Sequence, residues 1–371
     1  MGKRGNGEGS ITRRKDGLYM GRYSVQTATG SKRKTIYGKT RQEVSEKLNQ
    51  ALADRNSGLI SDAENLTVGE YLDRWLRDSV QGSVRASTYK SYGHQVRRYL
   101  KPSLGWMKVR KLSPMHVQGM YREMQDRGLS ARTIEYTHAV LHRALKQARR
   151  WGIVNRNVTE DVDSPQVKRE EIQPLNCDQT RALLKAAEGN RLEALYIVAV
   201  HTGMRPGEIL ALKWDDVDLD SGTLQLNRAL YDGEFNAPKT LRSRRRIKLT
   251  NGSVKALKAH RKRQLEERMR HAGLWQDNGL VFPSTVGTPL SHRNLIRSFK
   301  ALLKSAGLPQ AFRLYDLRHT CATLLLSRNV HPKYVQELLG HASIALTLDT
   351  YSHVIPGMDG GTASAMEDAL G

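Results

Sequence analysis

The apolar spacing of the sequence breaks off at residues 152–175. From Val68 to Trp151 apolar residues recur with helical spacing, whereas the stretch NRNVTEDVDSPQVKREEIQP mixes asparagine, proline and charge without that spacing. Such a composition is typical of an interdomain linker. The 371 residues also exceed one ordinary domain. We therefore expect separate domains on either side of a linker at residues 161–175.

The segment 1–62 carries the signals of a small sheet followed by a helix. Two turn sequences, at residues 15–17 and 28–31, separate three short runs of β-favouring residues, which are Ser10–Arg14, Leu18–Val25 and Arg33–Tyr37. Thr40 and Glu43 form a capping-box pattern that opens a helical run to about Arg55. The segment is predicted to be a three-stranded sheet backed by one helix.

Residues 63–160 are predicted to be a helical domain, and residues 176–371 a mixed α+β domain. The first has four helical blocks, Val68–Arg77, Arg85–Leu100, Pro114–Arg127 and Ala131–Trp151. The second has helical runs at Cys177–Ala187 and Arg191–His201, strand-like runs at Thr223–Leu230 and Arg245–Leu249, and further helices near Ser253 and from His292 onward. The whole is a multidomain, mainly α protein with small β elements.

The charge of the chain points to a polyanionic partner. The 60 Lys and Arg against 37 Asp and Glu give +23, and the net charge is +7 for residues 1–62, +9 for 63–170 and +7 for the rest. Because every segment is positive, we expect each to contact the polyanion, with nucleic acid as the leading candidate. A membrane surface is the competing polyanion, but no apolar run approaches the roughly 20 residues that span a bilayer.

Two further features limit the class of protein. The N-terminal sequence MGKRGNGEGS lacks the apolar region of a signal peptide, so a cytoplasmic location is expected. With Cys177 and Cys321 as the only cysteines, a disulfide framework and a cysteine-rich zinc site are both excluded.

Several basic side chains are placed where they could contact DNA. The residues expected to do so are Arg13, Arg14, Arg22, Lys32, Arg33 and Lys34 of the small sheet, and Lys90, His94, Arg97 and Arg132 of the helical domain. For the sheet, a solvated basic face explains the same residues equally well.

Four motifs in the last segment carry the candidate chemistry. The sequence HTGMRPGE places Arg205 in a turn beside Glu208, and APKTLRSRRRI places Lys239 in a hairpin between strand-like runs. RLYDLRHT offers Arg318 near a helix start, and LLGHAS offers His341 in a turn ten residues before Tyr351.

Each of these residues has a plain structural explanation, but the set fits phosphoryl transfer without a metal. Arg205 could form a local ion pair, Lys239 could be a surface lysine, and Arg318 could pair with Asp316. Together, guanidinium groups clamp a phosphodiester, a lysine can protonate the leaving oxygen, and a tyrosine can form a covalent phosphoester. A metal-dependent nuclease would instead need clustered carboxylates, and the sequence WDDVDLDSGT is better explained as the polar entry to a strand.

The succession TGMRPGE, PKT, LRHT, LGHAS and TYSHV resembles the tyrosine recombinase family of phage-type integrases. The resemblance covers essentially the whole chain: residues 1–62 resemble an arm-type DNA-binding domain, 63–160 a helical core-binding domain and 176–371 the catalytic domain with its C-terminal tail. The function it implies is site-specific DNA recombination that integrates or excises a mobile element. A non-catalytic DNA-binding regulator or architectural protein is the alternative that charge alone supports.

The resemblance also implies a role for each residue. Arg205 and Arg318 would bind the scissile phosphate, Lys239 would be the general acid, and Tyr351 would attack to give a 3′-phosphotyrosyl link. His341 would contact the phosphate and accept the proton of Tyr351. The acidic position that supports the first arginine corresponds to Glu208.

This sequence departs from the family pattern at two points. Tyr315 stands where the family usually has a histidine, three residues before Arg318, and we expect its phenol to position a phosphate oxygen. The alternative is a packed aromatic ring whose hydroxyl does not meet DNA. The spacing from His341 to Tyr351 is also one residue longer than in the best-known members, so the intervening loop should differ.

Partners and cofactors follow from the same resemblance. No metal or nucleotide cofactor is expected, because a phosphotyrosine conserves the energy of the broken bond. The expected partners are double-stranded attachment sites and a homotetramer on two duplexes, and the resemblance leaves room for an accessory DNA-bending or directionality protein. The tail contains a short amphipathic run, Ala363–Leu370, which in the family docks on a neighbouring subunit; disorder is the alternative.

Overall fold

The computed structural model divides the chain into two compact units, residues 1–169 and 170–371. It describes residues 9–27, 30–56, 65–167, 173–236, 244–351 and 361–370. The division falls inside the stretch that the sequence predicts as a linker, at residues 161–175. The further division near residue 62 remains a prediction.

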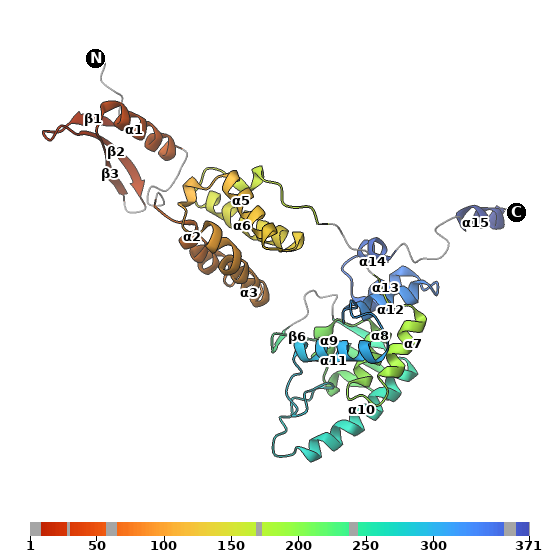
Figure 1. The fold of residues 1–371 in the computed structure, drawn as a ribbon. Helices are drawn as coiled ribbons and strands as arrows, with labels where there is room; N and C mark the ends of the chain where they lie inside the picture. The colour runs from red at the N-terminus through yellow and green to blue at the C-terminus, as the bar shows by residue number, and fades with distance from the viewer. Residues whose placement is uncertain are drawn as a thin grey trace. The chain divides into compact units, whose positions relative to one another are not determined.

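The N-terminal segment is an antiparallel sheet covered on one face by a helix, as the sequence predicts. The strands are β1 (Ser10–Arg13), β2 (Tyr19–Thr27) and β3 (Gly30–Gly38), in the order β1-β2-β3, and the helix is α1 (Arg41–Asn56), all shown in red in Figure 1. Tyr23 and Leu48 form the buried centre. A Cβ atom on Gly21 would lie 2.9 Å from Val44, so this glycine permits the close approach of α1 to the sheet.

The second segment is helical, and its blocks match the predicted ones closely. It consists of α2 (Val68–Trp75), α3 (Ala86–Gln95), α4 (Lys101–Leu104), α5 (Pro114–Asp126) and α6 (Ala131–Arg150), with π-helical turns at Leu76–Val80 and Val96–Leu100. Thr67 and Glu70 form a capping box in which each side chain accepts from the other residue's backbone N–H. One apolar core, centred on Tyr71, Trp75, Leu100 and Tyr121, joins these helices.

Residues 170–371 form an α+β unit around α8 (Glu193–Thr202). This helix is apolar on all sides, and α10 (Asn251–Arg270) and α12 (Asp316–Leu326) both pack against it. The other helices are α7 (Cys177–Ala186), α9 (Pro206–Leu210), α11 (His292–Ser305), α13 (Pro332–Leu339), α14 (Ile344–Tyr351) and α15 (Gly361–Leu370). The strands are β4 (Val217–Asp218), β5 (Thr223–Leu226), β6 (Ala229–Tyr231), β7 (Glu234–Asn236) and β8 (Arg245–Lys248).

The strand-like run predicted over Thr223–Leu230 is divided between two strands, β5 and β6. The strand ends at Leu226 because Asn227 and Arg228 turn their side chains to the buried carboxylate of Asp216, at 2.9 and 2.5 Å. Strand β5 pairs with β4 and β8, whereas β6 pairs with β7 in a separate hairpin. The hairpin turns at Asp232 and Gly233, which both have positive φ, as an Asp-Gly turn requires.

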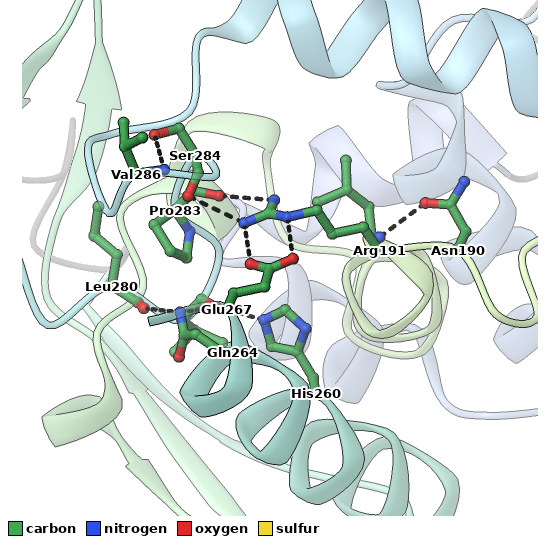
Figure 2. A network of polar contacts seen from close by, with 11 residues as sticks. Asn190, Arg191, His260, Gln264, Glu267, Leu280, Pro283, Ser284 and Val286 are labelled. Carbon is green, nitrogen blue, oxygen red and sulfur yellow. Dashed lines mark hydrogen bonds and ion pairs between the residues drawn. The ribbon is translucent and has the colours of Figure 1, made fainter. Parts of the chain in front are cut away.

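A polar network joins Arg191, just before α8, and the C-terminal half of α10 to the loop before α11 (Figure 2). Arg191 forms a bidentate ion pair with Glu267, with N–O distances of 2.8 and 2.9 Å. It also donates to the carbonyl oxygens of Pro283 and Ser284. Further along α10, Gln264 and His260 contact the carbonyls of the same loop. These contacts hold α10 and the loop before α11 against the start of α8, the central helix of the unit. In the part of the chain that the structure describes, no helix is long and apolar enough to cross a membrane.

Candidate active site

A buried carboxylate holds the first candidate arginine. Glu208 accepts from Nη1 of Arg205 at 2.9 Å, and its other oxygen accepts from the Arg205 backbone N–H at 2.9 Å. On its far side Glu208 pairs with Arg245 at 3.2 Å, whose Nε donates to the carbonyl of Leu338 at 2.6 Å. Burial alone would raise the pKa of Glu208, but Arg245 and Arg205 outweigh it and lower the pKa. A carboxylate that is ionised at neutral pH thus orients the guanidinium of Arg205.

Two helix ends hold the second candidate arginine. Arg318, 1% exposed, donates from Nη1 to the carbonyl of Gly203 and from Nη2 to the carbonyl of Leu339, both at 2.7 Å. Gly203 and Gly340 end α8 and α13 in the left-handed conformation, which leaves carbonyl oxygens without helical partners. A cation at two helix C-termini is electrostatically favourable. The alternative explanation, a pair of Arg318 with Asp316, does not hold, because Asp316 accepts from Arg313 and Arg318 donates to the two carbonyls.

Helix α14 is fastened to this site through two hydroxyl groups one helical turn apart. Thr347 contacts Nδ1 of His341 at 2.8 Å, and Tyr351 contacts Nδ1 of His319 at 2.6 Å. The carbonyl of His341 accepts from the side chain of Gln336 at 2.7 Å. Tyr351 is 2% exposed, so the candidate nucleophile is a buried side chain in this state of the chain.

Burial and the nearby arginines set the protonation states. Burial, with Arg318 and Arg205, lowers the pKa of His341 to about 4, so this imidazole is neutral at neutral pH. Burial also lowers the pKa of Arg318, to about 10, which leaves its guanidinium charged. The phenol of Tyr351 has a raised pKa through burial, a shift that the charge of Arg318 opposes. Attack by Tyr351 therefore requires removal of a proton.

Tyr315 is partly exposed and lies next to the site residue His319. It occupies the N-cap position of α12 without a side-chain cap bond, is 39% exposed, and packs edge-on against His319 with ring centroids 5.3 Å apart. The alternative of a packed aromatic whose hydroxyl does not meet DNA is not tested by this exposure. Its contact with phosphate remains a prediction.

We expect Tyr315→Phe to slow cleavage about tenfold to a hundredfold, the effect of losing one hydrogen-bond donor of about 1.4–2.8 kcal/mol to the transition state. Single-turnover cleavage of saturating DNA measures this, with His341→Ala as a comparison that should cost more. A wild-type rate in Tyr315→Phe would leave the ring with a packing role only.

The structure brings together Arg205, Glu208, Arg318, His341 and Tyr351, while Lys239 lies outside the described residues. Two neighbours of the site were missed from the sequence. Arg245 shares a face of β8 with the buried Ile247, and this alternation was the available signal. His319 directly follows Arg318, and no local sequence pattern predicts its contact with Tyr351, 32 positions away.

The predicted DNA-contacting residues of the sheet divide between its two faces. In the register of β2 and β3, Arg22 and Arg33 are on the face opposite to Tyr23, which faces α1, and both are exposed. The pairing of Lys34 with Tyr23 places Lys34 on the α1 side. Arg13 lies over the ring of Tyr19 and Arg14 over the ring of Tyr37, whereas the side chain of Lys32 is outside the description. Arg22 and Arg33 are thus exposed on the face that α1 leaves open, whereas Arg14 also pairs with Asp16 at 3.3 Å.

In the helical segment, Lys90, His94 and Arg97 are exposed at helical spacing along α3 and the turn after it. Arg132 is also exposed, but it forms an ion pair with Glu135 at 2.9 Å. The structure tests none of these as DNA contacts. The acidic sequence at 215–220 has the structural role expected of it, because Asp216 and Asp218 bind side chains and backbone N–H groups around β4. No group of three metal-ligating side chains occurs within the described ranges.

Comparison with known proteins identifies the family. Residues 173–357 match the phage integrase family, and residues 67–125 match the phage integrase N-terminal SAM-like domain. The tyrosine recombinase XerC-like protein of Caldanaerobacter subterraneus subsp. tengcongensis is 31% identical over 347 residues, which cover 87% of this chain and 88% of that protein. This chain belongs to the phage integrase family. It is accordingly a site-specific recombinase of the tyrosine class.

Other members agree with this assignment. An integrase of Streptomyces ambofaciens is 32% identical over 326 residues, 85% of this chain and 83% of that protein. The Tn1549 transposon integrase, solved with transposon right end DNA, has the same fold with a TM-score of 0.69 at 22% identity, over 82% of this integrase and all of that chain. The lambda integrase, solved as a tetramer bound to a Holliday junction, has a TM-score of 0.61 at 20% identity. The match covers 96% of this chain and 99% of that chain.

Proposed function

We propose that this recombinase joins two DNA attachment sites by cutting and rejoining strands through a 3′-phosphotyrosyl link on Tyr351, and so integrates or excises a mobile element. The observation that carries the proposal is the convergence of Arg205, Arg318, His341 and Tyr351 on one site of the catalytic unit. These four side chains, between positions 205 and 351 of the sequence, are held there by contacts with Glu208, with the carbonyls of Gly203 and Leu339, and between α14 and two histidines. A protein that only binds DNA has no use for this arrangement.

In the proposed reaction, Arg205 and Arg318 bind the scissile phosphate and stabilise the charge that develops on its oxygens. Glu208 orients Arg205, and the two helix ends orient Arg318. Tyr351 attacks phosphorus, and Lys239 protonates the departing 5′ oxygen. His341 contacts the phosphate, and Tyr315 donates to one of its oxygens. The roles of Lys239 and Tyr315 rest on the sequence pattern.

The proposed partners are double-stranded attachment sites and three further copies of the chain, which would form a tetramer on two duplexes in the bacterial cytoplasm. The support is the net positive charge of every segment and the solved relatives, which include a transposon integrase with DNA and an integrase tetramer on a Holliday junction. The small sheet would bind distal arm sites through Arg14, Arg22 and Arg33. An accessory DNA-bending or directionality protein is compatible with this scheme.

We expect covalent cleavage to proceed in excess EDTA, because two arginines and a lysine supply the positive charge that a metal ion would otherwise supply. The measurement traps the chain on a nicked suicide duplex that carries candidate attachment sites, with and without chelator, and resolves the adduct on a denaturing gel. A chelator-dependent loss of the adduct that magnesium restores would refute the mechanism.

A further inference from the structure

His319, a histidine of the site with no role yet assigned, contacts the hydroxyl oxygen of Tyr351. Nδ1 of His319 lies 2.6 Å from the hydroxyl of Tyr351, and the two rings are 5.7 Å apart at 55°. His319 sits in the first turn of α12, directly after Arg318, and is half-buried. No role follows for it from the sequence pattern, which assigns the proton of Tyr351 to His341.

The direction of this hydrogen bond follows from the state of the two groups. The phenol is protonated, since burial raises the pKa of Tyr351. The imidazole is neutral near pH 7, since burial lowers the pKa of His319. Among the residues that the structure describes, Nδ1 of His319 is the acceptor available to the buried phenol. The tyrosine therefore donates, and the imidazole carries its proton on Nε2.

The other candidate base is occupied differently. Nδ1 of His341 contacts Thr347, one helical turn before Tyr351, and so fastens α14 rather than the phenol. Tyr315 offers a phenol, which is a poor proton acceptor at neutral pH. Its ring instead packs against His319, 5.3 Å away, and helps to fix the imidazole plane.

We propose that His319 is the proton acceptor for Tyr351 in strand cleavage; this assignment rests on the function proposed above. As the phenol oxygen forms its bond to phosphorus, its proton passes to Nδ1 of His319, and the bond to the 5′ oxygen breaks as Lys239 protonates that oxygen. In rejoining, a 5′ hydroxyl attacks the phosphotyrosine, the bond from phosphorus to the tyrosine oxygen breaks, and the imidazolium returns the proton to Tyr351. Protons and bonds balance in both directions.

Several neighbouring charged groups shift the pKa of His319. The carboxylate of Asp316 raises the pKa of His319, and the cations of Arg313 and Arg318 lower it. From the other elements of the site, Tyr351 and His341 face the same imidazole. Because burial and the cations keep the pKa below the ordinary 6.5, the proton acceptor is lost only when the pH falls below that value.

The test compares His319→Asn with His319→Ala, and uses His271→Asn as the matched control at the exposed end of α10. Asparagine keeps an acceptor near the Nδ1 position but cannot take up a proton. We expect single-turnover cleavage of the suicide duplex to slow about 10²- to 10³-fold in both variants and to remain unchanged in the control. The loss of rate of the wild-type protein below pH 6.5 should be absent in His319→Asn, and free imidazole should partly rescue His319→Ala.

A duplex with sulfur as the bridging 5′ atom separates the base from the acid. A thiolate leaves without protonation, so a Lys239→Ala defect should disappear on this substrate while the His319→Asn defect persists. Disappearance of the His319→Asn defect would overturn the proposal. A rate in His319→Asn equal to or above wild type would also overturn it, and would leave the contact as one that holds Tyr351 away from the phosphate.

A measurement without DNA tests the direction of the hydrogen bond. In ¹⁵N NMR at pH 7.5 we expect Nδ1 of His319 to be unprotonated and its shift to change in Tyr351→Phe; a protonated Nδ1 would overturn the proposal. If the wild-type chain forms no adduct, or forms it elsewhere than at Tyr351, the proposed function fails together with this inference. If the adduct forms at Tyr351 but His319→Asn is unimpaired, only the inference fails.

Discussion

Tyr351→Phe is expected to bind DNA with wild-type affinity and to form no covalent adduct. The substitution removes the nucleophilic oxygen but leaves Arg205 and Arg318 in place, each held by contacts that do not involve Tyr351. The yield of adduct should fall by at least about 10³-fold, which corresponds to roughly 4 kcal/mol of activation free energy. A denaturing gel with the suicide duplex measures the adduct, and a gel shift at fixed salt measures the affinity.

The matched control is Tyr334→Phe, the same change in an exposed tyrosine of α13. It should leave the adduct yield unchanged. The lost contact with His319 should cost Tyr351→Phe only about 1–2 kcal/mol in unfolding free energy, because Thr347 still fastens α14 to His341. An adduct of wild-type intensity would place the nucleophile on another residue.

Local patterns in the sequence predict most of the helices, because caps and apolar spacing act within a few residues. The Thr67–Glu70 capping box and the apolar faces of α2, α5 and α6 are examples. The break after Leu226 was not predictable in this way. It depends on Asp216, ten positions earlier, whose buried carboxylate draws two side chains out of the strand pattern.

In the candidate site, too, local sequence patterns do not predict the long-range contacts. Residue types in a recognisable order identify Arg205, Glu208, Arg318, His341 and Tyr351, but not what each contacts. The partners of Arg318 are carbonyl oxygens up to 115 positions away, and they exist only because α8 and α13 end beside one another. The contact between His319 and Tyr351 likewise depends on how α14 packs on α12. Local reasoning therefore selects chemical groups, whereas tertiary packing assigns their hydrogen-bond partners.

Glu208→Gln is expected to destabilise the catalytic unit strongly as well as to impair cleavage. The carboxylate is buried between Arg205 and Arg245, and the side chain of Arg245 is itself only 8% exposed. Removing one partner of a buried ion pair leaves an uncompensated charge, at a cost of about 3–5 kcal/mol. For a unit of this size the melting temperature should fall by on the order of 10 °C. Thermal unfolding followed by circular dichroism measures the shift.

The control is Glu337→Gln, the same change in an exposed ion pair with Lys333 on α13, which should cost less than about 1 kcal/mol. The pH dependence adds a second check. Because the pKa of Glu208 is lowered in the folded state, its contribution is fully present above the ordinary value of 4.5 and is lost as the pH falls through the folded value. The difference in melting temperature between the wild-type protein and Glu208→Gln should therefore become smaller below pH 4.5. Equal melting temperatures at neutral pH, or a gap that widens in acid, would show that Glu208 does not hold the two arginines as an ionised group.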